Sequence, residues 1–149
     1  MTMGWHRMLQ FTPALFGCYL WEGNHSYGLI RRSRACVINV PTADMADTVV
    51  NVGNSTGAAL DKFEAYGLTA AQPDRVAAPL IDECYANFEC RLVEDRQINE
   101  YGLFIWEIVK AHVAPAVTDP ETLHYRGQGQ FRIAARVPDY SDRFKPQNL

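Results

Sequence analysis

The sequence lacks the short motifs that mark several common enzyme classes. No G-x-G-x-x-G pattern follows a predicted strand, which disfavours a Rossmann dinucleotide fold. The Walker phosphate-binding pattern is also missing, and no nucleophile elbow is predicted. The four histidines stand far apart, without a helix-spaced pair or an evident carboxylate partner. Hydrolytic triads and metal catalysis are therefore disfavoured, and no metal site is predicted.

A surplus of positive charge and a long apolar run are missing too. The chain has 14 basic and 17 acidic residues and a net charge of −3, so nothing favours non-specific binding to nucleic acid. No apolar stretch approaches the roughly 18–20 residues of a membrane span, and the N-terminus does not resemble a signal peptide. We therefore predict a cytoplasmic protein with neither nucleic acid nor a membrane as a partner.

Closely spaced cysteine pairs are absent as well. Cys18, Cys36, Cys84 and Cys90 each stand alone in an apolar run. None belongs to a C-x-x-C motif or has the short spacing of a zinc ribbon. Buried free thiols in a reducing compartment are therefore favoured over disulfides.

The composition is that of a globular protein. With 48% hydrophobic and 21% charged residues, the chain is expected to fold as a single domain over 1–149. Short helices are predicted at 27–32, 43–50 and 60–66. Apolar patterns predict strands at 15–21, 35–40, 87–92, 103–109 and 131–137. Together these elements predict a mainly β fold with short helices, arranged as a Greek-key-like β-barrel.

Two of the predicted strands differ in pattern. In 87–92, Phe88, Cys90 and Leu92 alternate with polar residues, which predicts a half-buried antiparallel strand. Residues 103–109 are apolar on both faces apart from Glu107. A barrel interior would cover one face of that strand, and a helix or a partner subunit would cover the other. This pattern favours a homodimer.

The stretch 51–69 is rich in small and polar residues. Two glycines and several hydroxyl residues end one apolar segment, and Lys62 stands beside an aromatic residue at the start of the next. Such a loop can bring backbone N–H groups, hydroxyls and an ammonium close to an anion without steric obstruction. The pattern indicates a phosphorylated ligand.

The first residues of the chain suggest a planar partner for that phosphate. A flavin mononucleotide (FMN) needs donors for its phosphate and flat apolar contacts for its ring. The chain offers donors at Thr2, Ser26, Ser55, Thr56 and Lys62, and contacts at Met3, Trp5, Cys18 and Phe131. The residues alone leave a second interpretation open and favour it, with core aromatics at Trp5 and Phe131 and a solvated lysine at position 62.

Several short motifs follow one another in a fixed order along the chain. These motifs are Thr2-Met3-Gly4-Trp5-His6, Phe16-Gly17-Cys18, Cys36-Val37-Ile38-Asn39-Val40-Pro41, Gly53-Asn54-Ser55-Thr56-Gly57, Asp61-Lys62-Phe63, Gly67-Leu68-Thr69, Ala78-Pro79-Leu80-Ile81 and Phe88-Glu89-Cys90-Arg91. As an ordered set they resemble the flavin reductase-like FMN-binding family, especially its flavoredoxin-like branch. The resemblance extends from residue 1 to about Phe131.

The resemblance implies an FMN-binding split β-barrel, normally a homodimer with the flavin near the subunit interface. By position, it implies that Thr2, Met3 and Trp5 line the flavin ring, with Phe131 close by. Asn24 and Ser26, in a turn before a helix, would meet the phosphate, and Lys62 would add a positive charge. FAD is the alternative to FMN. Relatives usually carry a further strand before the Thr-Met motif, so an N-terminally shortened barrel is expected.

Two functions follow from the resemblance. The first is an oxidoreductase that passes hydride from NAD(P)H through bound flavin to free flavin, ferric iron or a protein acceptor. The second is a non-catalytic flavin-binding electron carrier with a redox partner protein. A third possibility, suggested by the short start, is an incomplete copy that binds flavin weakly or not at all. Many relatives have a histidine where residues 97–100 here read Gln-Ile-Asn-Glu. No catalytic residue is therefore assigned.

Overall fold

The structure is a computed structural model that describes residues 1–134. Its secondary structure is mainly β, with short helices between the strands. In chain order the elements are β1 (His6–Gln10), β2 (Leu15–Tyr19), α1 (His25–Ser33), β3 (Ala35–Val40), the 3-10 helix η1 (Ala43–Met45), α2 (Ala46–Asn54), α3 (Lys62–Ala65), β4 (Ala70–Ala71), β5 (Leu80–Ile81), β6 (Ala86–Glu94), α4 (Ile98–Tyr101), β7 (Leu103–Val113), β8 (Thr122–Gly127) and β9 (Gln130–Ala134).

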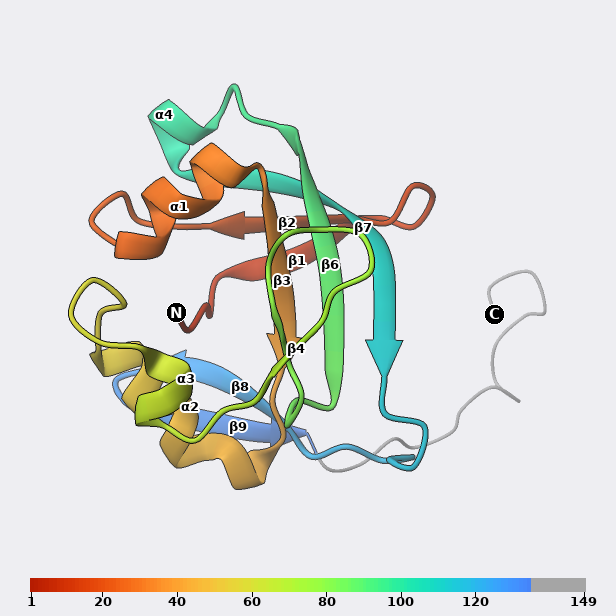
Figure 1. The fold of residues 1–149 in the computed structure, drawn as a ribbon. Coiled ribbons are helices and arrows are strands. Elements are labelled where there is room, and N and C mark those ends of the chain that lie inside the picture. The colour runs from red at the N-terminus through yellow and green to blue at the C-terminus, as the bar shows by residue number, and fades with distance from the viewer. Residues whose placement is uncertain (135–149) are drawn as a thin grey trace.

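The strands form one large antiparallel sheet and two small ones. The large sheet has the order β1-β2-β7-β6-β3, and β4-β5 and β8-β9 are separate pairs. Figure 1 shows the long strands crossing steeply, with α1 at one end and α2 packed near the β8–β9 hairpin at the other. The predicted mainly β, split-barrel class is confirmed. Among residues 1–134 no helix is long and apolar enough to cross a membrane.

The core is built mainly from residues of three neighbouring strands of the large sheet, β2, β7 and β6. Phe104 and Trp106 of β7 are fully buried, and their rings stack at 5.6 Å. Tyr27 of α1 packs edge-on against Phe104 at 5.4 Å. One chain therefore covers Trp106 completely. On the opposite face of β7, Leu103, Ile105 and Glu107 are half-buried, and the covering of that face by a partner subunit stays a prediction.

The sequence predicted the position of β3 at 35–40 correctly and the character of β6 only in part. The polar face of β6 was expected to be exposed, but Asn87 is 7% exposed and Glu89 is fully buried. The segment between β4 and β5 covers this face, and its backbone N–H groups bond to Glu89. The predicted alternation is therefore right, and the expected exposure of the polar face holds at Arg91 but is wrong at Asn87 and Glu89.

Several shorter elements also differ from the predictions. The helix expected at 43–50 is a 3-10 turn followed by α2, and β1 and β8 were not predicted. Residues Ile98–Tyr101 form α4, which ends at Gly102 with a φ of 61°. A Cβ at Gly102 would lie 2.6 Å from the carbonyl oxygen of Leu20, so only glycine fits there. Part of the strand expected at 131–137 lies outside the described residues.

Candidate functional site

The first residues of the chain lie against two separate parts of the fold. A methyl group on Gly53 of α2 would lie 2.7 Å from the hydroxyl oxygen of Thr2, so the Thr2 side chain rests on this helix. A methyl group on Gly4 would lie 3.3 Å from the ring of Tyr125 in β8. The segment therefore passes between α2 and the β8–β9 hairpin. Figure 1 shows its start between α1 and α3.

Aromatic residues surround this N-terminal segment. Trp5 is 74% exposed, and its ring lies 6.0 Å from that of Tyr19. Phe131 is half-buried and packs on Tyr125 at 5.3 Å. Met3 packs against the core. Three of the predicted ring contacts, Met3, Trp5 and Phe131, thus lie on or next to the N-terminal segment. Among them, Trp5 offers an exposed, flat apolar surface.

Lys62 begins α3 and bonds to the end of α2. Its Nζ donates to the carbonyl oxygens of Val52 at 2.6 Å and of Ser55 at 2.7 Å. The last carbonyls of a helix lack helical partners, and the negative end of the helix dipole favours a cation there. Burial lowers the pKa of Lys62. The ammonium has a third proton, which it can donate to an anion.

Residues 53–57 have the G-x-S-x-G spacing of a nucleophile elbow, although no elbow is predicted, and their surroundings show that they do not form one. An elbow places its serine on a sharp turn between a strand and a helix. Here the loop follows the end of α2, and the Ser55 hydroxyl donates to the carbonyl oxygen of Asn51 at 2.9 Å. Its hydrogen bonds within residues 1–134 include no histidine. Ser55 is therefore not an activated nucleophile.

The turn before α1 lies beside this loop. Asn24 is the N-cap residue of α1, but its side chain donates to the carbonyl oxygen of Trp21 at 3.2 Å and caps nothing. A methyl group on Gly57 would lie 3.5 Å from the ring of His25, so the turn and the loop are in contact. The first turn of α1, which contains Ser26, favours an anion through its free N–H groups. Lys62 favours an anion through its positive charge.

The side chain of Cys18 is buried in the core, although its backbone lies opposite His6 in the β1–β2 pairing. Its side chain is 2% exposed in the core, and its sulfur accepts a hydrogen bond from Nε1 of Trp106 at 3.3 Å. Burial raises the pKa of the Cys18 thiol to about 11. The Cys18 thiol, which was predicted to contact the flavin ring, therefore lies in the core without exposed surface for such a contact. All four cysteines are free, as predicted.

The model of the flavin reductase like domain family matches residues 1–133. The chain belongs to this family. An uncharacterized protein of Archaeoglobus fulgidus is 33% identical over 119 residues, which are 80% of this chain and 67% of that protein. The resemblance carried by the ordered sequence motifs is confirmed.

Solved structures of flavin reductase-like proteins share the fold. Flavoredoxin of Desulfovibrio vulgaris has a TM-score of 0.84 at 20% identity, over 95% of this chain and 81% of that one. An FMN-binding domain of a flavin reductase-like enzyme from Shewanella baltica gives 0.81 at 24% identity, over 92% and 79%. The NADH:FAD oxidoreductase SgcE6 of Streptomyces globisporus gives 0.75 at 20% identity, over 93% and 78%.

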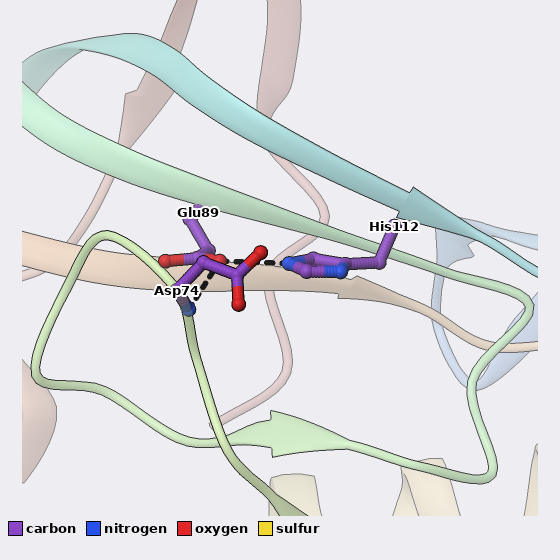
Figure 2. A group of neighbouring side chains, drawn as sticks. All are labelled: Asp74, Glu89 and His112. Atoms are coloured by element: carbon purple, nitrogen blue, oxygen red, sulfur yellow. Dashed lines mark hydrogen bonds and ion pairs between the residues drawn. The ribbon is translucent and has the colours of Figure 1, made fainter.

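A second cluster lies on the face of β6 opposite Cys90, and the sequence analysis did not find it. The carboxylate of Glu89 accepts hydrogen bonds from the backbone N–H groups of Asp74 at 2.9 Å, Arg75 at 2.6 Å and Val76 at 2.9 Å. Nε2 of His112 in β7 lies 2.7 Å from the same carboxylate (Figure 2). Glu89 thus fastens the segment 74–76 to the sheet of this flavin reductase-like domain.

The ligand atoms of Asp74, Glu89 and His112 lie within 4.8 Å of one another, which is a spacing that a metal ion could use. However, the two Glu89 oxygens already take part in four hydrogen bonds, and these occupy the lone pairs that a metal would need. The Asp74 carboxylate is paired with Lys110 at 3.4 Å. The cluster is a structural anchor.

We expect the Glu89 cluster to make the free energy of unfolding fall in acid. Burial would raise the pKa of Glu89, but hydrogen bonds from His112 and the 74–76 backbone outweigh it and lower the pKa from 4.5 to about 2. Unfolded chains therefore bind a proton at this site at higher pH than folded ones. The stabilisation is complete above pH 4.5 and is lost as the pH falls toward 2. Denaturant unfolding between pH 6 and 2 should show a steeper decline for the wild type than for Glu89→Gln. Parallel curves would contradict this assignment.

Proposed function

We propose that this protein is an FMN-binding oxidoreductase that passes hydride from NAD(P)H through the flavin to free flavin, ferric iron or a protein acceptor. The observation that carries the proposal is the grouping of Lys62, the first turn of α1 and the exposed Trp5 around the first residues of a chain of this family. Solved relatives described as FMN-binding and as an NADH:FAD oxidoreductase support it.

The described residues fit FMN. Lys62 and the first turn of α1, with Asn24 and Ser26, would hold the phosphate by charge and by N–H donors. Thr2, Met3 and Trp5 would line the ring, with Phe131 nearby, and Ser55 would support the loop through its backbone carbonyl. FMN supplies the redox chemistry when bound, while the chain binds, orients and shields it. No side chain is needed as a general base.

Steady-state assays with NADH and NADPH test the proposal. We expect NAD(P)H oxidation that requires FMN and an added acceptor, either free flavin or ferric iron. Protein that binds FMN but oxidises neither nucleotide would exclude the reductase and leave an electron carrier. Protein that binds no FMN would exclude both functions.

A non-catalytic electron carrier is the second candidate. The fold likeness to flavoredoxin supports this function. An apolar side chain that a redox partner could cover is exposed at Trp21, outside β1 and the proposed dimer face. Rapid electron exchange with a partner protein, together with negligible NAD(P)H oxidation, would favour it. The four free thiols suit the reducing cytoplasmic compartment that we propose for either function.

We also propose that the protein is a homodimer in which the partner covers the flavin. Exposed apolar residues gather on β1 and its flanks, including Trp5, Met8, Leu9 and Phe11, of which Phe11 is 91% exposed. We expect sedimentation as a dimer at micromolar concentration. Phe11→Glu should shift the protein to monomer, whereas Tyr101→Glu, which changes an exposed aromatic on α4, should not. A wild-type monomer at this concentration would contradict the proposal.

A further inference from the structure

An open hollow of about 430 Å³ lies between the end of α1, the start of β3, β6 and the segment 75–78. Three of its lining residues are arginines, namely Arg34, Arg75 and Arg91. The others are Ser33, Ala35, Val76, Ala77, Ala78 and Leu92. A volume of this size lies in the range of small-molecule sites, roughly 300–1,000 Å³. The hollow thus combines cationic groups with an apolar wall.

The charges of the hollow are only partly neutralised. Arg34 pairs with Asp95 at 2.6 Å. Within residues 1–134 the side chains of Arg75 and Arg91 form no ion pair. Glu107 stands opposite Arg91 in the strand register, but no ion pair joins the two side chains. Two guanidinium groups without a bound carboxylate stand out in a chain whose net charge is −3.

The walls of the hollow are held in place by backbone bonds. Ala35 and Arg91 are direct partners in the β3–β6 pairing, and the N–H of Leu92 donates to the carbonyl oxygen of Arg34 at 2.9 Å. On the opposite wall, the N–H groups of Arg75 and its two neighbours bond to the buried Glu89 carboxylate. Both sides are therefore fixed before any ligand arrives, which reduces the entropy cost of binding.

The hollow is separate from the candidate flavin site. The turn at Asn24 begins α1 and Ser33 ends it. Nine helical residues span about 14 Å at 1.5 Å per residue. Asn24 and Ser26 of the candidate flavin site lie at the first turn of this helix, whereas the hollow lies at its C-terminal end. A ligand here does not depend on bound flavin.

We propose that this hollow binds the phosphate group of a nucleotide. The guanidinium groups of Arg75 and Arg91 each present planar N–H donors that match phosphate oxygens in pairs. The side chains of Val76, Ala77, Ala78 and Leu92 supply apolar surface for the base or the sugar. A terminal phosphate group is shared by free adenine nucleotides and by the adenosine half of NADPH, and NADH lacks it.

Calorimetric titration of the full chain tests the proposal, with ADP and with adenosine 2′,5′-bisphosphate as probes. Saturable binding is expected, and Arg75→Ala and Arg91→Ala should each weaken it about tenfold or more, as for charge-assisted hydrogen bonds. Arg31→Ala is the matched control. Arg31 lies on α1 outside the hollow and bonds to Asn99, so this variant should bind like the wild type. Thermal unfolding of each variant checks that the fold is kept.

Displacement of the bound probe by NADPH and by NADH identifies the molecule that carries the phosphate. Displacement of the probe by NADPH but not by NADH would support the proposal with the reduced dinucleotide as ligand. Binding of ADP without displacement by NADPH would support it with a free nucleotide as ligand. No saturable binding, or equal weakening by Arg31→Ala, would overturn the proposal. Loss of probe binding in Lys62→Met with no effect of Arg75→Ala would also overturn it, because the phosphate would then belong to the flavin site.

Discussion

Glu89→Ala should lower the free energy of unfolding by about 3–5 kcal/mol, the range for removing one partner of a buried, hydrogen-bonded charge. The substitution leaves the backbone N–H groups of Asp74, Arg75 and Val76 without an acceptor, and His112 loses its partner. Each buried donor that stays unsatisfied costs about 1–3 kcal/mol. Water can reach part of the exposed segment and offset some of this cost. Chemical denaturation at pH 7 measures the change.

Two further variants give the expected order of effects. Glu89→Gln keeps one acceptor oxygen and should cost less than Glu89→Ala. Glu107→Ala removes a half-buried carboxylate from the neighbouring strand, where it forms no ion pair within the described residues, and should cost the least. A loss for Glu89→Ala no larger than that for Glu107→Ala would show that the carboxylate does not anchor the segment.

Lys62→Met should weaken FMN binding by about 1–3 kcal/mol, or roughly 5- to 150-fold in Kd, as expected for the loss of a charge-assisted hydrogen bond. The ammonium also bonds to the carbonyl oxygens of Val52 and Ser55, so some stability is lost as well. Both carbonyls lie at the end of α2, next to exposed residues of the loop, where water can replace the ammonium. The effect on binding should therefore exceed the effect on unfolding.

Flavin titration and thermal unfolding, measured on the same samples, separate the two effects of Lys62→Met. Lys62→Arg keeps the charge and should retain most of the affinity. Lys110→Met removes a surface lysine that pairs with Asp74 and should leave FMN binding unchanged. An unchanged Kd in Lys62→Met, or equal losses in the two methionine variants, would remove Lys62 from the phosphate site.

The sequence predicted those elements in which the local pattern of apolar residues agrees with their burial in the fold. Ala35–Val40 is apolar and ends at Pro41, and it is a strand over the predicted residues. β1 was missed because all of its residues are exposed, so the strand shows no apolar alternation. Its pairing with β2 is a long-range contact that no local pattern marks. The match of the family model to residues 1–133 confirms the identification made from the ordered motifs.

The burial of Glu89 could not be predicted from the sequence around it. A glutamate in a period-two strand predicts a solvated face, and only the segment 74–76, which folds over it, reverses that expectation. His112 comes from another strand and was interpreted as an isolated residue. The Lys62 loop was recognised because its glycines, hydroxyls and lysine lie close together in sequence. Its bonds to the carbonyls of Val52 and Ser55 depend on helix packing and were not predictable.

Titration of the purified protein with FMN, followed by visible absorption and flavin fluorescence, tests the central claim most directly. We expect saturable binding of one FMN per chain, with a shifted absorption band and changed fluorescence, and a higher Kd in Lys62→Met. A spectrum identical to that of free FMN at every protein concentration would contradict the claim that the first residues, α1 and Lys62 form a flavin site.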